Sequence, residues 1–216
     1  MKTLSVAGLK RSYRAIKPQI KKRILEFSLR HNDPDKEVFS ELCFCILTAN
    51  ANALRCDDAI KELKAAGLLL NGSACRIKPK LVGRVRFHNK KAEFIVRARD
   101  LFSRGTRLEV KKYLNKRDIV ATRDWLVEHI KGYGYKEASH FLRNIGLGQD
   151  IAILDRHILK NLKHFGVIAK VPPSTGSRKV YMAIEEKMRK FSKGVGIPLE
   201  DLDLLFWSLQ TGFIFK

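Results

Sequence analysis

Residues 125–138 read Trp125-Leu126-Val127-Glu128-His129-Ile130-Lys131-Gly132-Tyr133-Gly134-Tyr135-Lys136-Glu137-Ala138, which indicates a helix, a tight turn and a second helix. Gly132 and Gly134 bracket one residue, and glycine permits φ > 0 and a close approach of the backbone to a partner. The second helix begins with N–H groups that can bind an anion. An ordinary helix–helix turn has the same pattern, because glycine is common at helix ends. The hairpin therefore predicts either a plain turn or a phosphate-binding site at Gly132 and Gly134.

The charge of the chain favours the phosphate interpretation. The 216 residues include 43 Lys and Arg against 22 Asp and Glu, which gives a net charge of +21 and a pI near 10.1. A protein with this excess binds polyanions, and its affinity falls steeply as salt concentration rises. Ribosomal-type proteins, membrane-surface proteins and thermophilic proteins share such a charge, but nucleic-acid binding is the expectation. Charge alone does not separate an enzyme from a passive binder.

The hydrophobic pattern predicts an all-α protein. Apolar residues recur at intervals of three and four, and the content of 45% hydrophobic and 30% charged residues is typical of globular domains. Pro18 marks a kink or a fresh start in the first helix. Residues 67–79 carry turn signals, and residues 80–87 fit an irregular loop or a short strand. Helices are expected at about 9–27, 35–46, 55–66, 89–102, 123–130, 135–145, 156–164, 178–191 and 199–209.

The cysteines are expected to be reduced core residues. Cys43, Cys45, Cys56 and Cys75 form no CxxC pair, and the first two lie in an apolar run. The last third of the chain contains no cysteine. This excludes the cysteine-ligated iron–sulfur loop of some DNA repair enzymes, and we expect no metal and no cofactor.

No segment predicts a membrane span or an export signal. The longest apolar runs, such as 43–47 and 204–207, are far shorter than the roughly 18 residues that span a bilayer. The start of the chain lacks a long apolar stretch. We therefore expect a cytoplasmic protein.

Two residues have the chemistry of a covalent catalyst. Lys136 opens the second helix of the hairpin, where the helix dipole disfavours an ammonium ion and so favours the nucleophilic amine. In so basic a chain, however, most lysines are solvated or pair with phosphate. Asp155 opens a later helix, where it is expected to be an N-cap. A capping carboxylate that faces a cleft could also stabilise positive charge on a sugar.

These segments together resemble the helix-hairpin-helix DNA glycosylase superfamily, and more closely the type 2, largely archaeal, 8-oxoguanine DNA glycosylase/lyases. The resemblance covers most of the chain and rests on Gly132–Asn144, Leu154–Leu159, Leu47–Asn50, Arg86–Ala92 and a chain that ends at Lys216. It implies two helical subdomains with the hairpin at the cleft between them. Residues 32–140 would form the central subdomain, and 1–31 with 141–216 the other.

The resemblance also implies the roles of three residues. Lys136 would be the nucleophile, and Asp155 its electrostatic and proton-transfer partner. Lys216, at the C-terminus, would help to distinguish 8-oxoguanine from guanine. The reaction itself requires a pair of this kind. Cleavage of a glycosidic bond builds positive charge on deoxyribose, so an anion beside the sugar and an amine at C1′ both lower the activation barrier.

Three further residues are candidates for handling the flipped base, since the target must leave the duplex before its sugar can react. Asn50 could fill the vacated space, or be an ordinary cap or turn residue. Phe87 and Trp207 could stack on the purine, although a tryptophan in an apolar run is commonly core. The apolar residues 213–215 suggest that the tail is docked rather than frayed.

The resemblance thus implies a bifunctional DNA repair enzyme of a prokaryotic, nucleoid-associated kind. It would act as a monomer on duplex DNA containing 8-oxoguanine, form a Schiff base, and cleave the strand 3′ to the abasic site by β-elimination. Three alternatives stay open: a non-catalytic helix-hairpin-helix DNA-binding module, a glycosylase for another oxidised base, and a basic RNA-binding protein.

Overall fold

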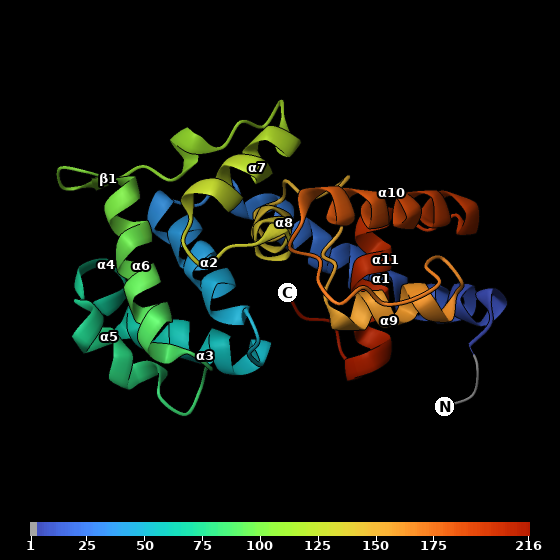
Figure 1. Ribbon diagram of the computed structural model, residues 1–216, viewed down its shortest axis with the longest axis horizontal. Coiled ribbons are helices and arrows are strands. Elements are labelled where there is room, and N and C mark those ends of the chain that lie inside the picture. The colour runs from blue at the N-terminus through green and yellow to red at the C-terminus, as the bar shows by residue number, and fades with distance from the viewer. Residues whose placement is uncertain (1–3) are drawn as a thin grey trace. The chain divides into compact units, whose positions relative to one another are not determined.

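The computed structural model describes residues 4–216 and confirms the all-α fold (Figure 1). Nearly all the regular structure of these residues is α-helical, and the short helix η1 (Lys111–Tyr113) is a 3-10 helix. There is one small exception to the helical structure. That exception is an antiparallel pair of two-residue strands, β1 (Ser103–Arg104) and β2 (Arg107–Leu108). The helices are α1 (Val6–Arg30), α2 (Asp35–Thr48), α3 (Ala53–Ala65), α4 (Leu68–Asn71), α5 (Ala74–Leu81), α6 (His88–Phe102), α7 (Ile119–His129), α8 (Tyr135–Asn144), α9 (Arg156–His164), α10 (Arg178–Val195) and α11 (Leu199–Thr211). None of the described helices is long and apolar enough to cross a membrane.

The chain divides into two compact units. The central unit comprises Arg30–Phe141, and the terminal unit comprises the residues up to Leu29 together with Leu142–Lys216. The central unit is continuous in sequence, whereas the terminal unit is assembled from both ends of the chain.

Helix α2 forms the core of the central unit. Every residue from Val38 to Thr48 is buried, which explains why this helix lacks the polar face of a surface helix. Helices α3 and α6 pack against it, and α5 packs against both of them. Cys43, Cys45 and Cys56 lie in this core, as expected, but Cys75 is exposed. The prediction for Cys75 is wrong because it lies in the first turn of the short helix α5, whose apolar contacts are made by other residues.

Helix α1 is held in the terminal unit by a buried carboxylate. Asp201, in α11, accepts hydrogen bonds from the Tyr13 hydroxyl at 2.6 Å and from Lys21 Nζ at 2.8 Å. Burial raises the pKa of Tyr13, and the hydrogen bond and charge of Asp201 act in the same direction. The first and last helices are therefore joined by polar contacts as well as by packing.

Helix α1 also runs through Pro18 without a new start. Proline removes one backbone hydrogen bond and usually breaks a helix. Here Pro18 is exposed, and the helix continues past it to Arg30. Buried residues on both sides, Leu9 and Ile20 among them, hold the helix against the unit.

The largest error of the sequence prediction concerns residues 67–87. Turn residues predicted a gap there, but α4 and α5 fill most of it, and α5 contains Pro79. Gly67, with φ of +66°, separates α3 from α4 in place of a longer loop. The possible strand at 80–87 is absent, since its first two residues end α5, and the short β1–β2 pair after α6 was not predicted.

Candidate active site

The helix-turn-helix predicted from the sequence is present as α7, the hairpin residues 130–134, and α8. Gly132 has φ of +92°, and a Cβ there would lie 2.5 Å from Phe94 Cδ2. Glycine is thus required at this position by both backbone conformation and packing. Gly134 is different: its φ is not positive, and a Cβ would meet only Glu137 Oε2 at 3.4 Å.

Tyr133, between the two glycines, anchors the hairpin to the central unit. Its ring is buried, and its hydroxyl donates to the Leu42 carbonyl of α2 at 2.9 Å. Burial raises the pKa of Tyr133, and nearby acidic groups add to the effect, so the hydroxyl stays a donor. The hairpin is therefore fixed from its middle residue, while Gly132 is exposed and Gly134 is half-buried.

Glu137 closes the start of α8. Its Oε2 accepts a hydrogen bond from the Gly134 N–H at 3.2 Å, and the Gly134 carbonyl accepts the first helical bond from Ala138 at 3.0 Å. This is one half of a capping box, in which a glutamate at the third helical position satisfies the capping residue. The Gly134 N–H is consequently paired in this structure, and a phosphate that binds it must displace the Glu137 carboxylate.

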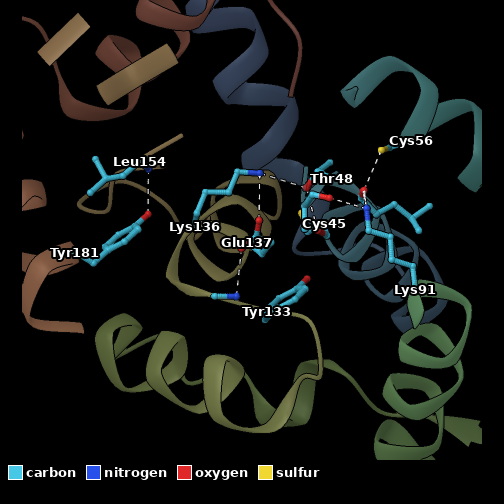
Figure 2. A network of polar contacts seen from close by, with 12 residues as sticks. Cys45, Thr48, Cys56, Lys91, Tyr133, Lys136, Glu137, Leu154 and Tyr181 are labelled. Atoms are coloured by element: carbon cyan, nitrogen blue, oxygen red, sulfur yellow. Dashed lines mark hydrogen bonds and ion pairs between the residues drawn. The ribbon is translucent and has the colours of Figure 1, made fainter. Parts of the chain in front are cut away.

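Lys136 extends from the first turn of α8 toward the end of α2 (Figure 2). Its Nζ lies 3.4 Å from Thr48 Oγ1 and 3.7 Å from Glu137 Oε1. Thr48 donates its own proton to the Cys45 carbonyl at 2.9 Å, so it serves Lys136 as an acceptor. The Lys136 side chain keeps 21% of its surface exposed. The Lys136 amine is thus held by Thr48 and Glu137 but still accessible to solvent. This arrangement suits a nucleophile better than a freely solvated lysine does.

Asp155 is the N-cap of α9, as predicted. Its Oδ1 accepts hydrogen bonds from the N–H groups of His157 at 2.7 Å and Ile158 at 2.8 Å. Tyr181 fixes the residues just before Asp155. Its hydroxyl accepts a hydrogen bond from the Leu154 N–H at 3.1 Å and donates one to the Ala152 carbonyl at 2.7 Å. The carboxylate is therefore held in one orientation. Asp155 belongs to the terminal unit and Lys136 to the central unit.

Asn50 and Phe87 are the two non-glycine residues with positive φ in the part of the chain that the structure describes, at 54° and 58°. Side chains disfavour this left-handed region, and such strain is concentrated at functional sites. Asn50 is exposed just after α2, and it is not the cap of α3, a role that Asn52 takes. Phe87 precedes α6 with 57% of its surface exposed, and the Arg86 guanidinium lies over its ring.

The C-terminal residues are docked on the terminal unit. Trp207 contacts the rings of Phe213 and Phe215, with centroids 5.0 Å and 6.3 Å away. Arg23 Nε of α1 donates to the Phe215 carbonyl at 3.0 Å. Lys216 follows directly and is partly buried. The tail is thus fixed by an aromatic cluster and one charged donor, which sets the position of its last residue.

Three residues with a clear part in this geometry were not predicted: Thr48, Glu137 and Arg23. Glu137 could have been found, since a glutamate three residues after a helix-capping position is a sequence signal. The other two act through contacts between distant segments, for which the sequence holds no local signal. No group of His, Cys, Asp and Glu that could hold a metal ion is found among residues 4–216.

Comparison with known proteins decides the family. Residues 20–197 match the family model described as 8-oxoguanine DNA glycosylase. The chain belongs to this family. It is 41% identical over 210 residues to the 8-oxoguanine DNA glycosylase/AP lyase of Fusobacterium nucleatum, covering 96% of each chain. It is 42% identical over 208 residues to that of Methanocaldococcus jannaschii, covering 93% of each.

Solved structures of this glycosylase family agree with the fold. The crystal structure of the M. jannaschii 8-oxoguanine glycosylase/lyase in complex with a 15mer DNA containing 8-oxoguanine matches with a TM-score of 0.84 at 37% identity, covering 98% of this chain and 99% of that one. The 8-oxoguanine DNA glycosylase of Thermotoga maritima matches with a TM-score of 0.83 at 36% identity, covering 98% of both chains. The prediction of the family from the hairpin and its lysine is confirmed.

Proposed function

We infer that this protein is a DNA glycosylase with AP lyase activity that removes 8-oxoguanine from duplex DNA. The family match and the relatives named for this activity support the reaction class, and the net charge of +21 suits a DNA substrate. The observation that carries the residue assignment is the Lys136 amine, anchored at Thr48 and partly exposed at the start of the hairpin's second helix.

We propose that Lys136 is the nucleophile. Its Nζ forms a bond to C1′ while the C1′–N9 bond breaks, and the electron pair leaves with the base, which takes up a proton. Opening of the sugar at O4′ then gives an iminium ion on the lysine. Loss of the C2′ proton expels the 3′ phosphate by β-elimination. Asp155 stabilises the positive charge that develops on the sugar and accepts or returns protons. No step requires a cofactor.

Base recognition is assigned to Lys216, Trp207 and Phe87, and the filling of the duplex to Asn50. Lys216 helps to read the lesion, because the N7 of 8-oxoguanine is a hydrogen-bond donor and needs an acceptor. Trp207 and Phe87 stack on the flipped purine. Asn50 enters the space that the base leaves, which suits an exposed residue on a strained turn. Gly132 and Gly134 allow a DNA phosphate to approach the hairpin backbone.

The enzyme is proposed to work as a monomer, without an iron–sulfur cluster, on the prokaryotic nucleoid in the cytoplasm. A molecular mass in solution that matches 24.7 kDa without DNA, and one protein plus one duplex with DNA, would support the monomer. A stable larger species would contradict it.

Reductive trapping tests the nucleophile. Borohydride should link the wild-type protein covalently to a duplex containing 8-oxoguanine, whereas the Lys136→Gln variant should give no adduct and no strand cleavage. Lys131→Gln is the matched control, because it removes an exposed lysine from the same hairpin. An adduct of undiminished yield in Lys136→Gln would contradict the assignment.

The same assay separates the alternatives. A panel of duplexes with different oxidised bases should show the fastest trapping with 8-oxoguanine, and faster trapping of another base would favour a different glycosylase. A wild-type protein that binds DNA but traps none of these substrates would be a DNA-binding module.

A further inference from the structure

Helix α6 carries a lysine deep in the central unit. Lys91 has only 3% of its surface exposed. Its Nζ donates to the backbone carbonyls of Leu47 at 2.7 Å and Ala49 at 2.6 Å (Figure 2). Both carbonyls belong to the last turn of α2 and the residue that follows it. A lysine is rarely buried to this extent, so its position calls for a reason.

Burying this ammonium group is unfavourable. Burial lowers the pKa of Lys91, and the positive charges of Lys136 and Arg86 act in the same direction, against the opposing effects of Cys56 and Glu137. A core of this kind would be easier to build with a leucine or methionine at this position. The residue is therefore better explained by what it holds than by a gain in stability.

Lys91 caps the C-terminus of α2. The last carbonyls of a helix have no partner within it, and a cation is favoured there by the helix dipole. The Cys56 thiol also donates to the Leu47 carbonyl, at 3.2 Å. Thr48 lies between the two carbonyls that Lys91 binds, and its hydroxyl meets Lys136. The next residue after these is Asn50, in its left-handed conformation.

We propose that Lys91 is a positioning residue that fixes segment 47–50, so that Thr48 anchors the Lys136 amine and Asn50 keeps its strained turn. The proposal rests on the functions proposed for Lys136 and Asn50. Lys91 itself does not touch the substrate. It acts through the backbone of segment 47–50, which carries the Thr48 contact to Lys136 and the exposed side chain of Asn50.

The test compares Lys91→Met with Lys90→Met in the full-length protein. Both variants lose one positive charge from α6, but Lys90 is exposed. Single-turnover trapping with borohydride is measured at saturating enzyme on a duplex containing 8-oxoguanine and on a preformed abasic site. Since misplacement of a reacting group by about 1 Å costs about 100-fold in rate, Lys91→Met should slow trapping on both substrates by about 10- to 100-fold. The Kd for DNA should stay close to that of Lys90→Met, and Lys91→Arg should recover much of the rate.

The outcomes are distinct. A Lys91→Met protein that melts cooperatively and traps DNA as fast as Lys90→Met overturns the proposal. If Lys91→Met does not melt cooperatively, Lys91→Gln, which keeps a neutral donor, is compared in its place. If neither variant folds, Lys91 serves stability alone and the proposal is overturned. Absence of an adduct with the wild-type protein would instead refute the proposed function.

Discussion

Substitution of the two hairpin glycines by alanine should have different consequences. In Gly132→Ala the backbone must keep φ of +92° with a side chain present, and the new Cβ would lie 2.5 Å from Phe94 Cδ2. The left-handed conformation costs roughly 1–2 kcal/mol, and forcing the Phe94 ring off its rotamer costs about 0.5–1.5 kcal/mol. In Gly134→Ala the nearest atom is Glu137 Oε2 at 3.4 Å, an ordinary contact.

The expected loss of stability is therefore about 1.5–3.5 kcal/mol for Gly132→Ala and less than about 1 kcal/mol for Gly134→Ala. For a chain of this length, the loss in Gly132→Ala lowers the melting temperature by roughly 3–14 °C. Thermal unfolding followed by circular dichroism measures both values.

DNA binding completes the comparison. If a phosphate approaches the outer side of the hairpin backbone, the Cβ of Gly134→Ala should weaken DNA binding in a protein of nearly unchanged melting temperature. Equal melting temperatures for the two variants would refute the packing argument at Gly132. Unchanged DNA affinity in Gly134→Ala would refute the phosphate contact at that glycine.

Three further predictions follow from individual contacts. One thiol, Cys75, should react rapidly with a thiol reagent in the native protein, because burial protects the other three and raises the pKa of Cys56 to about 11; rapid reaction of more than one would contradict this. Burial raises the pKa of Glu200, and the charge of Asp201 acts in the same direction. The protonated carboxyl therefore suits the fold better than the carboxylate. This contribution to stability is present at low pH and is lost as pH rises through the raised pKa of Glu200. Glu200→Gln should accordingly raise the melting temperature at pH 7, with a gain that vanishes as pH falls below the usual glutamate range; a gain independent of pH would show another cause. Arg23→Ala should release the tail and reduce the preference for 8-oxoguanine over other substrates more than it reduces DNA affinity, with Lys22→Ala on the same helix as control; parallel losses would argue against a role of the docked tail in recognition.

The sequence predicted those features that depend on neighbours along the chain. Helix α9 has the predicted bounds, and Asp155 caps it, since an aspartate before an apolar-periodic run is a local signal. Helices α4 and α5 were missed because their turn residues are outweighed by packing of Leu68, Leu69 and Ile77 in the core.

The surroundings of Lys136 depend on contacts that no local pattern records. Its acceptor Thr48 is 88 positions away in the sequence. Lys91, which binds the backbone carbonyls on either side of Thr48, is more than 40 positions away from them. Backbone carbonyls carry no sequence signature, so a residue that binds them is seen only in the folded chain. The positive φ of Asn50 and Phe87 likewise has no plain sequence signal, since neither residue is glycine.

The pairing of α1 with α11 through Asp201 has a consequence for biosynthesis. Tyr13 and Lys21 lie 188 and 180 positions before Asp201, so they have no carboxylate partner until the ribosome has made α11. The central unit, continuous in sequence, can assemble during that interval. A polypeptide that terminates before residue 199 would lack Asp201, the carboxylate that Tyr13 and Lys21 share. The discontinuous arrangement thus delays the polar anchoring of α1 until α11 has been synthesised.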